Sequence, residues 1–275
     1  MIVFDYAFNA AKGDEGDDAM PDKTLGTSLV MYDRNSGFTY GNALGSKEAD
    51  LHSVNEIQKF VKQMGYSRVH IRCDNEPAAV SLQKQLLDVR SAKDEATTIS
   101  NGKTRDSKSM GAAEVTIRWW RSKLRALRYS VEMAYGIKLT PDSLLWSWLA
   151  RHSAWVTSRY RLRADGTTAF FGAFGHNYTG EVLPFGETVL MKAPQSSSGA
   201  RRGQARQNKA DTAWIKGIWV GKTDNNDEHI VLTDTGKFTC RTVRRLEPAH
   251  RYNIGTPLVP TFLPAHVENW YLHQG

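Results

Sequence analysis

The sequence is poor in cysteine and in long apolar runs, and these absences exclude several classes of protein. Only two cysteines, Cys73 and Cys240, occur in 275 residues, and their separation matches neither a zinc-binding nor a redox motif. A disulfide-stapled secreted domain is therefore excluded, and a reduced intracellular protein is expected. No apolar stretch approaches the about 18 residues that span a bilayer, and no signal-peptide pattern opens the chain, so no membrane partner is expected. Internal repeats are also absent.

Composition and charge indicate a globular protein with an anionic partner. A chain that is 40% hydrophobic at this length can bury a full core, either as one large domain or as a large and a small one. The net charge of +7 favours anionic partners without identifying them. The sequence begins directly within a strand-like run, which indicates a fragment or a truncated gene product.

Acidic residues lie within one predicted strand and directly after another. In residues 2–8 the even positions from Ile2 to Phe8 are apolar and share one face, while Asp5 projects from the other. An acid in so apolar a strand is costly unless something neutralises it. A later strand, at 68–73, ends directly before Asp74.

The elements around these acids follow from periodicity and from turn residues. We expect further strands at 25–32 and 38–44, and helices at 54–64 and 78–89. Ser53 is predicted to cap the first helix, and Pro77 lies near the start of the second. Residues 94–108 are polar and predict an irregular, mobile segment.

The stretch Ser107 to Tyr129 predicts a long helix with two stripes. An apolar stripe should face a core, and a charged stripe with one acid and four arginines should lie roughly 100° around the cylinder. The apolar stripe consists of Ile117, Trp120, Leu124, Leu127 and Val131, and the charged stripe of Glu114, Arg118, Arg121, Arg125 and Arg128. For the charged stripe alone, a solvated basic face with an incidental glutamate is the simpler interpretation.

The second half of the chain predicts one more helix and a small β module. The helix opens at Thr140 and Pro141, and His152 on its apolar side is interpreted as a residue of the core edge rather than a ligand. Residues 195–211 are polar and basic, and they predict a linker or a long loop that either contacts phosphates or is simply solvated. Short strands are expected at 214–221, 229–233 and 237–244.

Three acids in this order are compatible with a metal site. If Asp5, Asp74 and Glu114 converge, their mutual repulsion is tolerable only around cations. Ligands that are all oxygens favour Mg²⁺ or Mn²⁺ over zinc. Two such ions support in-line phosphoryl transfer, and the arginines after Glu114 would then hold nucleic-acid phosphates.

Several motifs, taken in order, resemble the integrase of Copia-type (Ty1/Copia) LTR retrotransposons, in the retroviral integrase superfamily. They are VFDYAF around Asp5, IRCDNE around Asp74, SMGAAEVTIRWW around Glu114, the segment DGTTAFFGAFGHNYTGEVLPFGETVLMKAP, and GIWVGKT with the strands that follow it. The resemblance covers nearly all residues from Ile2 to about Glu247.

This resemblance implies the fold class, the activity and the site. The fold would be α/β, a ribonuclease H-like mixed sheet flanked by helices, followed by a small all-β (SH3-like) module. The activity would be DNA 3′-end processing and strand transfer, with Asp5, Asp74 and Glu114 as the catalytic, metal-binding triad for two Mg²⁺ or Mn²⁺ ions. Candidate DNA contacts are Arg118, Arg121, Lys123, Arg125 and Arg128. Asn75 and Glu76 are interpreted as a turn beside the triad.

The resemblance also implies partners, a location and an organisation. DNA would be the partner, as element cDNA ends and target DNA, and the active complex would be a homo-oligomer. The protein would act in the nucleus, with a cytoplasmic virus-like-particle stage if the element is intact. The expected organisation is a catalytic core at 1–165, a connecting segment at 166–194, the basic linker at 195–211, the β module at 212–250 and an irregular tail at 251–275.

Departures from the family pattern leave a second function open. The interval between Asp74 and Glu114 is longer than in typical retroviral members, Met110, Ala113 and Ala169 replace residues usual in the family, and the amino-terminal zinc module is missing from the sequence. The alternative is an inactive or domesticated integrase remnant that binds nucleic acid without turnover. A ribonuclease H-type nuclease is a third possibility, against which the β module argues.

Overall fold

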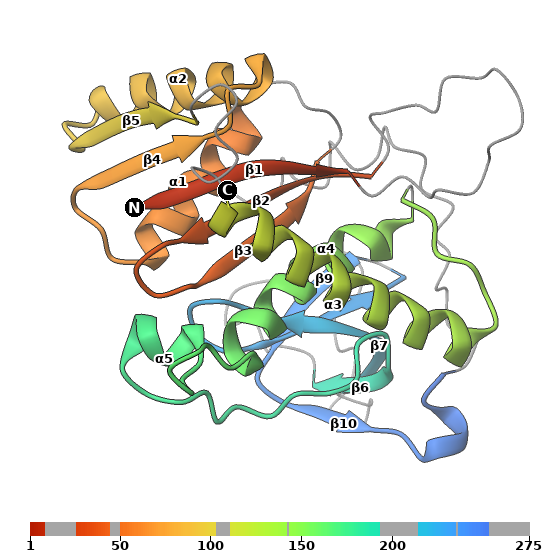
Figure 1. The fold of residues 1–275 in the computed structure, drawn as a ribbon. Helices are drawn as coiled ribbons and strands as arrows, with labels where there is room; N and C mark the ends of the chain where they lie inside the picture. Colours follow the sequence, from red (N-terminus) through yellow and green to blue (C-terminus); the bar gives the residue numbers. More distant parts are fainter. Residues whose placement is uncertain are drawn as a thin grey trace, which may run out of the picture. The chain divides into compact units, whose positions relative to one another are not determined.

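The chain forms two compact units, each containing a five-stranded sheet (Figure 1). The computed structural model describes residues 1–8, 26–44, 50–102, 111–141, 143–192, 214–234 and 236–252. The first unit comprises the described residues of Met1–Leu127 and Thr140–Thr179, and the second comprises Arg128–Leu139 and those from Gly180 onward. The predicted linker at 195–211 and the tail beyond 252 lie outside the described residues.

The sheet of the first unit is mixed, with strand order β3-β2-β1-β4-β5. The central strand β1 pairs antiparallel with β2 and parallel with β4, and β4 pairs parallel with β5. The bounds are β1 Ile2–Phe8, β2 Thr27–Asp33, β3 Thr39–Ala43, β4 Val69–Cys73 and β5 Thr97–Asn101. This arrangement confirms the expected ribonuclease H-like class.

Two helices cover one face of this sheet, the face that carries the even-numbered side chains of β1. Helix α1 (Leu51–Gln63) and helix α2 (Pro77–Ser91) contribute Ile57, Phe60 and Leu82 to a fully buried core that also contains Ile2 and Phe4. Burial of this apolar surface, at roughly 25 cal/mol per Å², holds α1 and α2 on the sheet. The predicted apolar face of the first strand is therefore confirmed at these positions.

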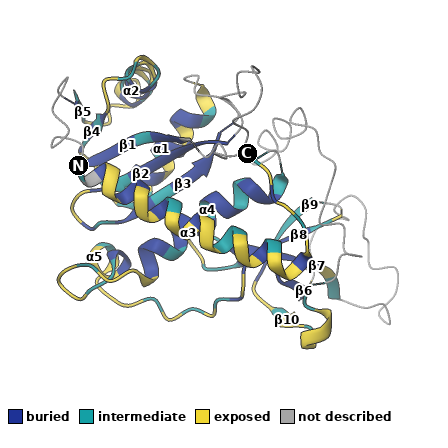
Figure 2. Cartoon of the chain, turned by 45° about the vertical axis from the view of Figure 1, so that its right-hand side comes forward, coloured by how far each residue is buried: buried dark blue, intermediate teal, exposed yellow. Residues whose placement is uncertain are grey.

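Helix α3 (Gly111–Tyr135) and helix α4 (Leu144–Tyr160) meet the opposite face of the sheet. The indole of Trp120 is fully buried, and its Nε1 donates to the carbonyl oxygen of Ala150 at 2.9 Å. Gly41 of β3 makes room for this ring, because a Cβ there would lie 2.8 Å from the indole nitrogen. This packing fixes the rotation of α3 about its axis, and exposed residues follow its outer side (Figure 2).

Strand β5 corrects the prediction of an irregular segment at 94–108. Its polar sequence, TTISN, has no clear apolar alternation, and polar side chains hold it in place. His70 of β4 contacts the hydroxyls of Thr98 and Ser100 at 2.8 and 2.7 Å, and Gln83 of α2 donates to the carbonyl oxygens of Ile71 and Ser100 at 3.0 and 2.9 Å.

Helix ends differ from expectation in two places. Asp50, not Ser53, caps α1, because its Oδ1 accepts the Ser53 backbone N–H at 2.7 Å and Ser53 itself is buried inside the helix. Helix α4 begins at Leu144, after the cap residue Ser143, rather than at Thr140. Within the described ranges, no helix is both long enough and apolar enough to cross a bilayer.

The second unit is built on an antiparallel sheet with strand order β10-β6-β7-β8-β9. The bounds are β6 Thr188–Lys192, β7 Trp214–Lys222, β8 His229–Thr233, β9 Gly236–Cys240 and β10 Val243–Arg245, before a short 3₁₀ helix at Pro248–His250. The single strand predicted at 237–244 is therefore two strands at opposite edges. The segment 166–194 contains helix α5 (Ala169–Phe174), in the first unit, as well as β6.

Candidate functional site

Two of the three predicted site acids lie side by side at the centre of the first sheet. In the parallel pair β1 and β4, Val3 is level with Arg72 and Phe4 with Cys73. Continuing this register by one residue puts Asp5 level with Asp74. Side chains alternate along a strand, so both acids fall on the face opposite the core that contains Phe4.

The charges of both carboxylates affect the pKa of the Cys73 thiol. Its pKa is raised to about 12, first by burial and then by the negative charges of Asp74 and Asp5. Asp5 also raises the pKa of the Tyr6 hydroxyl, after larger effects from burial, Asp50, Glu76 and Cys73. Two negative charges therefore act on one small region at this end of the sheet.

Each of these carboxylates accepts a hydrogen bond from the next residue in the chain. The Oδ1 of Asp5 accepts the Tyr6 backbone N–H at 2.8 Å, and the Oδ1 of Asp74 accepts that of Asn75 at 2.7 Å. A carboxylate has about four lone-pair sites, so one backbone bond does not exhaust its capacity to bind. Asn75 thus forms part of the turn that follows Asp74, as expected.

Glu114 lies in the first turn of α3, on the same face of the sheet as Asp5. Its neighbour Ala113 is buried against Val3, with Met1 and Tyr32 beside them. Val3 and Asp5 are two residues apart on β1 and share a face. The Glu114 side chain is exposed, so α3 delivers it to this face without burying it.

The donor set suits a hard divalent cation, but the described residues do not arrange three ligands around one. Carboxylate oxygens are the ligands that Mg²⁺ and Mn²⁺ prefer, and Asp5 in β1 and Asp74 directly after β4 supply them. In the part of the chain that the structure covers, no group of three or more His, Cys, Asp or Glu side chains is placed to hold a metal ion. The convergence of Glu114 with the other two acids stays a prediction.

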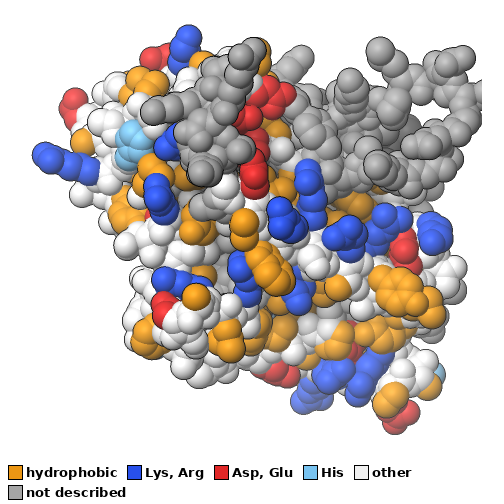
Figure 3. Space-filling model, in the orientation of Figure 1, with side chains coloured by type: hydrophobic (Ala, Val, Ile, Leu, Met, Phe, Trp, Pro, Cys, Tyr) orange, Lys and Arg blue, Asp and Glu red, His pale blue; other side chains and the backbone are white. Residues whose placement is uncertain are grey.

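The candidate DNA contacts on α3 differ in their surroundings. Arg118, Lys123 and Arg125 are exposed, and Arg121 is half-buried. Arg128 is engaged within the helix, because its Nε lies 2.8 Å from the Oε1 of Glu132. Figure 3 shows Lys and Arg side chains at several separate places on the face that it draws, with apolar and acidic side chains between them.

Two features of this surface were missed in the sequence. Arg72 lies on the face that carries Asp5 and Asp74, and its Nε is buried without a hydrogen-bond partner among the described residues. Trp119 is 47% exposed beside the buried Trp120. The two adjacent tryptophans in the sequence could have indicated an exposed ring, because adjacent helix positions point about 100° apart and only one of them can face the core.

His152 is a core residue, as the sequence indicated, although it is buried more deeply than the core edge. It is 2% exposed and stacks on Trp155 with ring centroids 5.5 Å apart. Burial lowers its pKa to about 3, with smaller effects from the charges of Arg151 and Arg159. A neutral, stacked imidazole in this position supports packing.

Comparison with solved structures finds retroviral integrases. The catalytic core domain of BIV integrase aligns at 15% identity with a TM-score of 0.45, over 63% of this chain and 93% of that one. The integrase in a simian T-cell lymphotropic virus intasome, in complex with PP2A regulatory subunit B56 gamma, aligns at 14% identity and 0.46, over 90% of this chain and 78% of that one.

A third solved structure, the HTLV-2 integrase catalytic core domain in complex with magnesium, aligns at 12% identity and 0.43, over 62% of this chain and 94% of that one. No protein-family model and no curated relative matches the sequence. At such low scores and identities the superpositions assign no role to any residue here, and the site rests on the geometry described above.

Proposed function

We propose that this chain is the catalytic core of an integrase, of the Copia retrotransposon type, that processes and joins DNA ends with the help of divalent metal ions. The observation that carries the proposal is the parallel register of β1 and β4, in which Phe4 is level with Cys73, so that Asp5 and Asp74 are the next residue on each side. Two like charges held together by the fold cost free energy unless a cation is shared between them. The ribonuclease H-like sheet and the sequence motifs support the same activity.

In this proposal Asp5, Asp74 and Glu114 hold Mg²⁺ or Mn²⁺. Bound metal of this kind activates an attacking oxygen and stabilises the leaving one in phosphoryl transfer. The chain itself supplies the rigid support: Asp5 lies within β1, Asp74 directly follows β4, and the packing of Ala113 on Val3 sets the start of α3. Exposed Arg118, Lys123 and Arg125 would hold phosphates of the DNA.

The proposal extends to partners and location. The polynucleotide would be the cDNA ends of the element and its target DNA, bound by a homo-oligomer of this chain in the nucleus, after a virus-like-particle stage if the element is intact. The solved structures named above include an intasome and a magnesium-bound core, and a corresponding assembly is proposed here for this chain.

An oligonucleotide assay with Mg²⁺ or Mn²⁺ tests the function. The full chain is expected to trim or join DNA ends, and Asp74→Asn should lower the rate by at least about a hundredfold, because several kcal/mol of transition-state stabilisation depend on the metal. Asp88→Asn, at an exposed position on α2, is the matched control and should keep full activity. Titration of each protein with Mg²⁺ should show weakened metal binding for Asp74→Asn alone.

Failure takes two recognisable forms. Turnover that survives Asp74→Asn contradicts the assigned site. A folded wild-type chain that binds DNA with a strong salt dependence but never reacts supports the non-catalytic remnant.

A further inference from the structure

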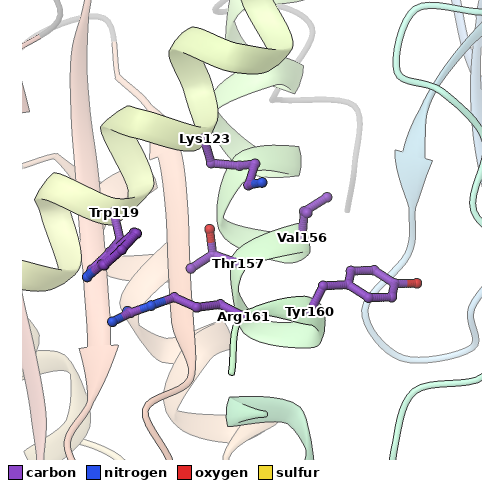
Figure 4. Close-up of a pocket in the computed structure, with 6 residues that line it drawn as sticks. All are labelled: Trp119, Lys123, Val156, Thr157, Tyr160 and Arg161. Atoms are coloured by element: carbon purple, nitrogen blue, oxygen red, sulfur yellow. The ribbon is translucent and has the colours of Figure 1, made fainter. Parts of the chain in front are cut away.

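A small hollow on the first unit combines two exposed aromatic rings with two cations. It is lined by Trp119, Lys123, Val156, Thr157, Tyr160 and Arg161, and it encloses about 200 Å³ (Figure 4). Trp119 and Lys123 come from α3, the next three residues from α4, and Arg161 from the position that caps α4. Figure 4 shows Trp119 and Arg161 together on one side of the hollow and Tyr160 on the other.

The geometry of α3 forces Trp119 outward. Trp120 is locked into the core by its bond to Ala150, and the preceding residue must point about 100° away. Trp119 and Lys123 are four residues apart, so they lie on the same side of the helix, one turn apart. The indole is therefore 47% exposed, and an aromatic ring with a polar N–H is a group that ligands and partners often cover.

The two rings are held in place. The guanidinium carbon of Arg161 lies 4.3 Å from the centroid of the Trp119 ring, a cation–π contact. Tyr160 is also 47% exposed, and its ring contacts Trp155 and Tyr178 at 6.3 and 6.0 Å between centroids. Both rings therefore present π surface to solvent. Because they are already held in place, a ligand that stacks on them would cause little further loss of side-chain entropy.

The polar groups that the hollow offers to a ligand are the cations of Lys123 and Arg161. The Thr157 hydroxyl already donates to the Ser153 carbonyl oxygen at 2.7 Å. Lys123 and Arg161 form no salt bridge with a carboxylate among the described residues. The volume is below the roughly 300–1,000 Å³ of sites for drug-sized ligands, so it suits one planar ring.

We propose that this hollow is a stacking site for a single unpaired base of a nucleic-acid strand, whose phosphates contact Lys123 and Arg161. Aromatic stacking beside a basic groove is the mode by which proteins hold single strands without reading their sequence. An acidic peptide would use the cations but would leave the exposed rings uncovered. The inference rests on the proposed function only in taking nucleic acid as the partner.

Binding of a fluorescent oligothymidine to the full chain, followed by anisotropy in EDTA, tests the inference. Trp119→Ala is expected to weaken binding about fivefold or more, the usual loss when one stacked base is released. Trp119→Phe should retain most of the affinity. Tyr129→Ala removes another exposed aromatic of α3 that does not line the hollow, and it should have no effect.

Two further measurements separate stacking from charge. An abasic oligonucleotide of equal length should bind wild type and Trp119→Ala equally. Lys123→Gln should reduce the slope of log affinity against log salt by about 0.7, the value for one phosphate of a single strand, whereas Trp119→Ala should leave the slope unchanged. Circular dichroism of each variant verifies that it is folded.

Three outcomes would overturn the inference: equal binding of oligothymidine by wild type and Trp119→Ala, an equal loss on the abasic strand, or equally tight binding of poly-glutamate. Because the assay contains no divalent metal, an inactive catalytic triad does not affect it. Conversely, loss of the base site leaves metal binding at Asp74 intact, so the two proposals fail separately.

Discussion

The second unit and the candidate site hold their acidic residues in opposite ways. Glu187 is fully buried, and Arg245 donates to both of its oxygens at 2.7 Å, with the Nε of Arg251 3.5 Å from Oε1. Asp5 and Asp74 instead lie next to each other, half-buried and exposed. An acid held by arginines stabilises a fold, whereas acids placed together leave a charge to be balanced by a ligand.

The first unit also contains buried acids whose partners lie within the fold. Glu56 of α1 is buried and binds Lys59 at 2.8 Å and Asn42 at 3.0 Å, and it also accepts from the Tyr40 hydroxyl. Asp33 is buried and accepts from Ser36 and from the Tyr66 hydroxyl. The difference therefore depends on the groups that surround each acid, and not on which unit contains it.

The largest expected effect comes from breaking the structural pair. Glu187→Gln should lower the free energy of unfolding by about 2–3 kcal/mol, less than the ~3–5 of a fully buried pair, because the Arg245 side chain is 39% exposed. Urea denaturation followed by near-ultraviolet circular dichroism measures the loss. Glu181→Gln, at an exposed position of the same unit, should change stability by no more than about 0.5 kcal/mol. Equal stability of the two variants would contradict the structural role of Glu187.

A smaller effect is expected at Glu56, and it depends on pH. Burial alone would raise its pKa, but Lys59 and Tyr40 outweigh burial and the pKa is lowered. A lowered pKa in the folded state stabilises the fold above the unfolded value, near pH 4.5, and this stability is lost as the pH falls through the folded value. Glu56→Gln should cost about 1–2 kcal/mol at pH 7 and flatten the acid side of the stability profile. A profile with an unchanged acid side would refute this account.

The smallest expected effect on stability is at the candidate site itself. Asp74→Asn removes one of two neighbouring negative charges, so the free energy of unfolding should stay within about 0.5 kcal/mol of wild type or rise slightly. The same thermal or urea measurement, made without divalent metal, provides the value. A loss as large as that of Glu187→Gln would mean that Asp74 is a structural acid, and the comparison would fail.

Much of the first unit was predictable because its apolar residues keep clear periods. The alternation in β1 and the stripe of α3 that contains Trp120 identified the core face of each element. Asp5 could be assigned to a strand and Asp74 to the end of one, but their proximity depends on the parallel register between β1 and β4, which no local pattern encodes.

The elements that the sequence did not reveal lack such periods. Strand β5 is polar and depends on His70 and Gln83 from other elements, and α5 is only six residues long. Ser53 and Asp50 are both good cap residues, so composition could not choose between them. The Trp119 hollow requires the end of α4 to lie beside α3, a tertiary arrangement that only the fold supplies.

The polar edge of the first sheet bears on uncontrolled pairing of strands between chains. An outermost strand exposes backbone N–H and C=O groups to any passing chain, and apolar edges of this kind lead to fibrils. Apart from Ile99, which packs against the core, strand β5 ends the sheet with threonine, serine and asparagine side chains, which offer an incoming strand little apolar surface to bury. The polar residues that made β5 hard to predict from the sequence thus also protect this edge of the sheet from aggregation.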